Sequence, residues 1–152
     1  MNETQELRQA KGEPDTSDRP TVLFACVHNA GRSQMAAAYA HQLSGGRVEV
    51  LSAGSEPAKS INSLVRDALL EDGIDISAET PKLLTPEAVK ASDVVITMGC
   101  GETCPIFPGK RYEDWEVADP AGQDLASVRE IRDDVKKRVE DLLTSLDVSV
   151  QP

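Results

Sequence analysis

Short apolar runs alternate with amphipathic stretches along this chain of 152 residues. Apolar runs rich in β-branched residues predict buried strands, whereas apolar residues recurring every three or four positions predict helices. We expect strands over Thr21–Ala25, Arg47–Ser52, Val94–Met98 and Arg111–Trp115, and helices over Ser33–Leu43, Ser60–Asp72, Thr85–Ala91 and Leu125–Leu146. This alternation is typical of a parallel sheet with helices on both faces. The pattern predicts a single-domain α/β fold in which helices flank a four-stranded parallel sheet.

The start of the chain lacks this pattern, because residues 1–20 are polar and carry no apolar stripe. Gly12, Pro14 and Pro20 interrupt the second half of this segment. We therefore expect a flexible tail over residues 1–20 and a folded domain over residues 21–148. The alternative is a short helix over Glu3–Ala10 that docks on a second copy of the chain and gives a homodimer.

Composition narrows the class of function. The formal net charge of −10 argues against nucleic acid as a partner and implies that any bound anion is held by a local positive site. No apolar run approaches the length of a membrane span, and the polar N-terminus does not resemble a signal peptide. Three cysteines are an odd number, which favours reactive thiols in a reducing compartment, the cytoplasm, over a disulfide framework.

The most informative motif follows the first predicted strand, where Cys26 is separated by five residues from Arg32. A loop between a strand and a helix turns its backbone N–H groups toward an anion, and the helix dipole adds positive potential. Such a field favours the thiolate form of a cysteine, and the planar guanidinium of Arg32 can bind two oxygens of a tetrahedral anion. The alternative is that Cys26 is a small core residue. The predicted anion-binding residues are Val27, His28, Asn29, Ala30, Gly31, Arg32 and Ser33.

Two side chains of this loop carry more specific expectations. We expect the Ser33 hydroxyl to hydrogen-bond the Cys26 sulfur and also to cap the following helix. His28 is expected to be a loop residue, with stabilisation of the thiolate as the alternative.

A second cysteine cluster, Cys100 and Cys104, follows the third predicted strand. Since the carboxyl ends of parallel strands share one edge of a sheet, we expect this cluster to lie near Cys26. Two cysteines four residues apart can meet within a helical turn, and the neighbouring Gly99, Gly101 and Pro105 allow the segment to bend. A redox pair serving Cys26 is favoured. Inert structural cysteines and a zinc site are the alternatives, although zinc usually takes about four ligands and the two histidines lie elsewhere.

The sequence Asp119-Pro120 lies in the loop ahead of the last predicted helix. Attack of a thiolate on an oxyanion requires a proton donor for the departing oxygen, and a carboxyl on a proline-stiffened loop can supply it. An ordinary Asp-Pro turn is the alternative. Together with the Cys26 loop, the motif favours an acid role for Asp119.

These elements, in this order, resemble the low-molecular-weight tyrosine phosphatase family and, within it, the arsenate reductases that are recycled by thioredoxin. The resemblance covers roughly residues 21–146 and includes the Cys26–Ser33 loop, Ser52-Ala53-Gly54, the paired cysteines and Asp119-Pro120. Asn29 matches the asparagine that steadies the loop in that family. Trp115 and Glu116 stand near the position where eukaryotic phosphatases of the family carry tyrosines, and the spacing of Cys100 and Cys104 is tighter than in many thioredoxin-coupled members.

The resemblance implies reduction of arsenate to arsenite, with phosphate and sulfate as mimics of the substrate. Cys26 would attack arsenate, Cys100 would form a Cys26–Cys100 disulfide, and Cys104 would convert it to a Cys100–Cys104 disulfide. Thioredoxin would reduce that disulfide, with no tightly bound cofactor and no metal. The alternatives are a protein tyrosine phosphatase, a reductase that uses mycothiol or glutathione, and a redox or oxyanion sensor.

Overall fold

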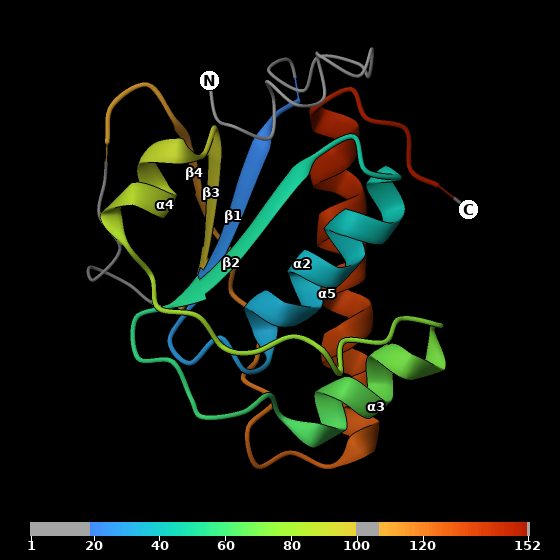
Figure 1. Cartoon of the computed structure of the whole chain (residues 1–152). Coiled ribbons are helices and arrows are strands. Elements are labelled where there is room, and N and C mark those ends of the chain that lie inside the picture. The colour runs from blue at the N-terminus through green and yellow to red at the C-terminus, as the bar shows by residue number, and fades with distance from the viewer. Residues whose placement is uncertain (1–18, 100–106, 152) are drawn as a thin grey trace.

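The computed structural model describes residues 19–99 and 107–151 (Figure 1). Four strands form one sheet in the order β2-β1-β3-β4, and every neighbouring pair is parallel. The strands are β1 (Thr21–Cys26), β2 (Glu49–Gly54), β3 (Val94–Met98) and β4 (Arg111–Asp114). The predicted four-stranded parallel sheet is therefore confirmed.

Helices cover both faces of the sheet, with α2, α3 and α5 on one side and α4 on the other (Figure 1). Their bounds are Arg32–Ser44 for α2, Ser63–Glu71 for α3, Pro86–Ala91 for α4 and Leu125–Ser145 for α5. Successive residues of β1 face opposite sides: Phe24 and Cys26 join the core under α2 and α5, and Leu23 joins the smaller core under α4. All four predicted helices exist, with ends shifted by up to three residues.

Side chains at the helix starts explain three of these boundaries. Asn62 accepts hydrogen bonds from the backbone N–H groups of Leu64 and Val65 at the start of α3. Thr85 accepts from Ala88 at the start of α4, and Asp124 caps α5. Each cap satisfies a backbone donor that the first helical turn leaves without a partner.

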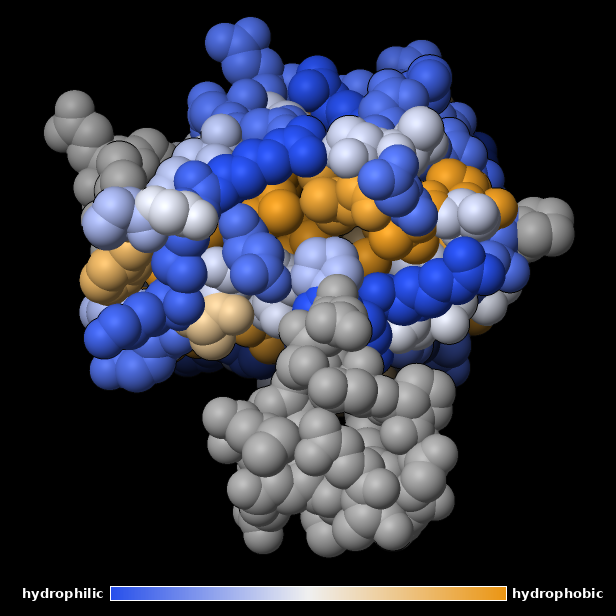
Figure 2. Space-filling view, turned by 90° about the horizontal axis from the view of Figure 1, so that it is seen from above, coloured by the Kyte–Doolittle hydropathy of each residue, from blue (hydrophilic) through white to orange (hydrophobic). Residues whose placement is uncertain are grey.

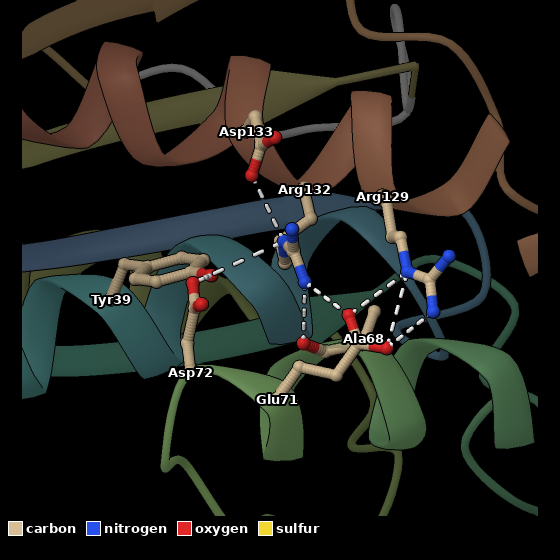
Figure 3. A network of polar contacts seen from close by, with 7 residues as sticks. All are labelled: Tyr39, Ala68, Glu71, Asp72, Arg129, Arg132 and Asp133. Atoms are coloured by element: carbon tan, nitrogen blue, oxygen red, sulfur yellow. Dashed lines mark hydrogen bonds and ion pairs between the residues drawn. The ribbon is translucent and has the colours of Figure 1, made fainter. Parts of the chain in front are cut away.

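A polar network joins α2, α3 and α5 on the outside of the larger core (Figure 3). Glu71 of α3 accepts from Arg129 and Arg132 of α5, with nitrogen–oxygen distances of 2.6 and 2.8 Å. These hydrogen bonds lower the pKa of Glu71 to about 2. Tyr39 of α2 donates to Asp72, and burial together with this bond raises the pKa of the tyrosine well above its usual value. The network fixes the C-terminal end of α3 against α5.

The carboxyl ends of the strands lie together at the lower edge in Figure 1. The opposite end, at which β1 begins, shows a band of hydrophobic side chains between charged and polar ones (Figure 2). Among the described residues, no helix is both long and apolar enough to cross a bilayer. The predicted tail falls outside the described residues except for Arg19 and Pro20.

Candidate active site

Cys26 is the last residue of β1 and lies in register with Gly54 of β2 and Met98 of β3. The chain moves from β1 outward to β2 and then returns to the other side of β1 to form β3. Open parallel sheets bind their ligands at such a switch point, outside the carboxyl ends of the strands. The loop from Cys26 to α2 occupies this position.

The carbonyl groups of the loop backbone point outward, toward residues 55–62. Four of them accept hydrogen bonds, at 2.7 to 3.2 Å, from backbone N–H groups of residues 55–62; the acceptors belong to Cys26, Val27, His28 and Ala30. No peptide bond here is cis, and the N–H of a trans peptide points away from its C=O. The N–H groups that follow these carbonyls therefore face the interior of the loop. The N–H of Asn29 accordingly points at the Cys26 sulfur, 3.2 Å away.

Asn29 holds the loop through its side chain. Its backbone has a φ of 50°, a left-handed conformation that asparagine tolerates better than most residues. Its Oδ1 atom accepts from the backbone N–H of Lys82 at 2.8 Å and from Gln34 at 3.1 Å. Its Nδ2 atom is thereby directed at Ser33 Oγ, 2.6 Å away. The completely buried Asn29 ties the loop to α2 and to the segment beside β2.

Ser33 lies 2.9 Å from the Cys26 sulfur through its Oγ atom. Because this oxygen accepts from Asn29, its single hydrogen is free to be donated to the sulfur. The predicted capping role of Ser33 is wrong: the N-cap of α2 is Gly31, and no side chain caps the helix. The predicted contact of Ser33 with the sulfur is present, so the buried Cys26 sulfur can accept hydrogen bonds from Ser33 Oγ and from the backbone N–H of Asn29.

Arg32 and Asp119 meet at the mouth of the loop. Nη2 of Arg32 is 3.8 Å from Oδ2 of Asp119, and Nη1 is 3.4 Å from the carbonyl oxygen of Val117. Gly31 allows this approach, since a Cβ built there would lie 2.6 Å from Cγ of Pro120. The carboxylate is 53% exposed, whereas the arginine side chain is only 13% exposed. The arrangement places a largely buried guanidinium and a solvent-accessible carboxyl group side by side.

A cleft of about 390 Å³ opens beside Arg32 and is lined by Gly99 and residues 114–118. A larger cavity of about 470 Å³ lies between α2, β2 and residues 74–83, and neither Cys26 nor Arg32 lines it. The smaller cleft is the better candidate for substrate entry, because Arg32 lines it. His28 is exposed and its Nδ1 atom lies 3.0 Å from the carbonyl oxygen of Glu56, away from the Cys26 sulfur contacts.

The second cysteine cluster, Cys100 and Cys104, lies outside the described residues. Gly99 directly precedes it and lies at the edge of the cleft beside Arg32. Within residues 19–99 and 107–151, no three His, Cys, Asp or Glu side chains are grouped so that they could hold a metal ion.

The site combines a buried thiol and an arginine in a loop of inward-facing amides at the edge of a parallel sheet. This combination is typical of enzymes that use a cysteine to act on an oxyanion. Residues 21–152 match the model of the low molecular weight phosphotyrosine protein phosphatase family. The chain belongs to this family, as the resemblance predicted.

The known relatives include both reductases and phosphatases. Arsenate reductase 2 of Staphylococcus haemolyticus is 35% identical over 131 residues, which cover 84% of this chain and 98% of that protein. A thioredoxin-dependent arsenate reductase from Corynebacterium glutamicum superposes with a TM-score of 0.78 at 48% identity, covering 93% of this chain and 68% of that one. An arginine phosphatase from Geobacillus stearothermophilus has a TM-score of 0.73 at 29% identity, covering 84% of this chain and 93% of its own.

Several residues that build the site were not predicted from the sequence. Gln34 is buried and donates to both the backbone oxygen and the side chain of Asn29. Asn62 donates its backbone N–H to Ala30 while its side chain caps α3. An asparagine directly before a helix was a usable signal for the cap. Nothing in the local sequence of Gln34 indicates its contact with the loop.

Proposed function

We propose that the protein reduces arsenate to arsenite at Cys26. The observation that carries the proposal is the buried Cys26 sulfur, which receives two hydrogen bonds inside a loop whose amides face inward and whose arginine meets Asp119. Hydrogen-bond donors stabilise the thiolate, the form of cysteine that attacks. The arsenate reductases among the relatives support arsenate as the substrate.

The first step is substitution at arsenic. Arsenate binds to the amides of residues 27–33 and to Arg32, as its mimics phosphate and sulfate would. The Cys26 thiolate forms a sulfur–arsenic bond, the bond from arsenic to one hydroxyl breaks, and Asp119 supplies the proton with which that oxygen leaves as water. Arsenic is still in the +5 state after this step.

The reduction occurs when a second thiolate attacks the Cys26 sulfur. We assign that thiolate to Cys100: a sulfur–sulfur bond forms, the sulfur–arsenic bond breaks, and its electron pair stays on arsenic, which leaves as arsenite. Cys104 then attacks Cys100, releases Cys26 and leaves a Cys100–Cys104 disulfide. Thioredoxin, a dithiol protein, reduces this disulfide by thiol–disulfide exchange and is itself oxidised. Both cysteines thereby return to thiols. The relay needs a reducing compartment, for which we propose the cytoplasm.

A steady-state assay tests the proposal. Arsenate, thioredoxin, thioredoxin reductase and NADPH should give NADPH oxidation with the wild-type chain, and arsenite should appear in equal amount. Cys26→Ser should abolish turnover, whereas Cys100→Ser and Cys104→Ser should stop the reaction after at most one turnover. Normal cycling of Cys104→Ser with thioredoxin would refute the relay. Turnover with mycothiol or glutathione plus a glutaredoxin, but not with thioredoxin, would show that a small thiol is the electron donor.

Phosphate ester hydrolysis is the second candidate function. The arginine phosphatase among the structural relatives favours it, and the Cys26 loop with Asp119 suffices for the chemistry. A phosphatase has no use for the distal cysteines. Efficient aryl phosphate hydrolysis that survives loss of Cys100 and Cys104, together with absent arsenate turnover, would favour this candidate.

The homodimer, given above as the alternative for the helix over Glu3–Ala10, stays a prediction. Sedimentation velocity tests it.

A further inference from the structure

Gly99 stands at the edge of the active-site cleft, directly after β3. It adopts a φ of +96°, a backbone conformation that residues with a side chain rarely take. Its sequence context, two residues before Gly101, suggested that it serves the bending of the cysteine segment. The structure shows a different reason for a glycine at this point.

The guanidinium of Arg32 lies against the position that a side chain would fill. A Cβ built on Gly99 would be 2.9 Å from Nη1, 3.2 Å from Nη2 and 3.3 Å from Cζ of Arg32. All three atoms belong to the planar end of the arginine, so the contact is with the group that binds the anion. Atoms this close repel one another, and the flexible arginine would have to move away.

Such a movement would break the contacts that Arg32 now makes. Its side chain is 13% exposed, and its guanidinium also contacts the carbonyl of Val117 and the carboxylate of Asp119. A methyl group on Gly99 would push the guanidinium out of this arrangement. Bidentate binding of an oxyanion depends on the orientation of the planar fork, so a small displacement should weaken it.

We propose that Gly99 is a positioning residue for Arg32. Because Gly99 has no side chain, the guanidinium has room to lie in the orientation that binds the oxyanion. The inference rests on the proposed function, since it takes Arg32 as the anion ligand. It adds to the site a residue that directly follows β3 and does not itself touch the anion.

Phosphate affinity tests the inference without requiring turnover. Gly99→Ala is compared with Gly73→Ala, a control whose φ is +79° and whose added Cβ would meet nothing within 4 Å. Both variants strain a left-handed backbone, but only the first displaces Arg32. We expect the dissociation constant for inorganic phosphate, measured by calorimetry in a Cys100→Ser background, to rise on the order of 10- to 100-fold for Gly99→Ala. It should stay within about twofold for Gly73→Ala. Equal affinities of the two variants would overturn the inference.

A double-mutant cycle separates the contact with Arg32 from backbone strain. In urea unfolding, Gly99→Ala should cost more stability than Gly73→Ala, and this excess should disappear in an Arg32→Ala background. If Gly99→Ala does not fold alone, the double variant with Arg32→Ala should fold, because its Cβ no longer meets a guanidinium. A double variant that is equally unfolded would overturn the inference.

The proposed function fails separately. Wild-type protein that binds phosphate but leaves arsenate unreduced would refute arsenate reduction, and the positioning role would still be decided by the phosphate affinities. Wild-type protein that binds neither phosphate nor arsenate would refute both.

Discussion

Replacement of Ser33 by alanine removes one of the two hydrogen-bond donors to the Cys26 sulfur. The Ser33 oxygen lies 2.9 Å from the sulfur, and the remaining donor, the N–H of Asn29, lies 3.2 Å away. A hydrogen bond to a charged group contributes about 1.5–3 kcal/mol, and each 1.4 kcal/mol is about a factor of ten in an equilibrium. The ratio of thiolate to thiol at Cys26 should therefore fall by roughly 10- to 100-fold.

The rate at which iodoacetamide alkylates Cys26 at pH 7 reports this change, because only the thiolate reacts. The assay uses a Cys100→Ser, Cys104→Ser background, in which Cys26 is the single remaining thiol. Ser44→Ala is the matched control: Ser44 is a buried serine of the same helix, and its hydroxyl bonds the carbonyl of His41 far from the site. Circular dichroism shows whether each variant is folded. An unchanged alkylation rate in folded Ser33→Ala, or an equal loss in Ser44→Ala, would refute the reasoning.

Three further predictions concern the proposed acid Asp119, the packing of its loop against Gly31, and the stability of the fold. Asp119→Asn should lower the rate of the first thiolate attack by about 100- to 10,000-fold, with phosphate affinity nearly unchanged, in single-turnover kinetics; an unaltered rate would remove Asp119 as the acid. Gly31→Ala places a Cβ 2.6 Å from Pro120 Cγ, so turnover should fall about 100-fold, and adding Asp119→Asn should bring little further loss if both act through one loop. Glu71 has a pKa of about 2, lowered from 4.5 by hydrogen bonds from two arginines of α5. Its ionised form therefore stabilises the fold above about pH 5, and this contribution is lost as the pH falls through about 2; the stability difference between wild type and Glu71→Gln should shrink over that range in urea titrations, and a constant difference would contradict the network.

The fold could be predicted from the sequence because its elements are marked locally. The apolar run ahead of Cys26 becomes β1, and α5, which lies within the predicted helix Leu125–Leu146, buries an apolar stripe from Val128 to Leu143. Thr85-Pro86 marks the start of α4 through a cap and a proline in the first turn. Such signals need only neighbouring residues, so they survive without knowledge of the tertiary structure.

The site was predictable only in part, because its geometry depends on contacts between distant segments. The spacing of Cys26 and Arg32 indicates an anion loop, but the amides of residues 55–62 that turn its carbonyls outward are invisible in that motif. For Ser33, the predicted contact with the Cys26 sulfur is present, but the predicted cap is not, because the contacts with Cys26 and Asn29 orient the hydroxyl. Gly99 carries no local sign that it faces an arginine 67 positions earlier in the chain.

Mass spectrometry of the alkylated protein after a single turnover with arsenate tests the thiol relay most directly. The wild-type chain should contain a disulfide between Cys100 and Cys104 and a free, alkylated Cys26. In Cys104→Ser the reaction should stop one step earlier, with Cys26 and Cys100 joined. Three alkylated thiols in the wild-type chain after arsenite has formed, or a bond from Cys26 to an added small thiol alone, would contradict the account.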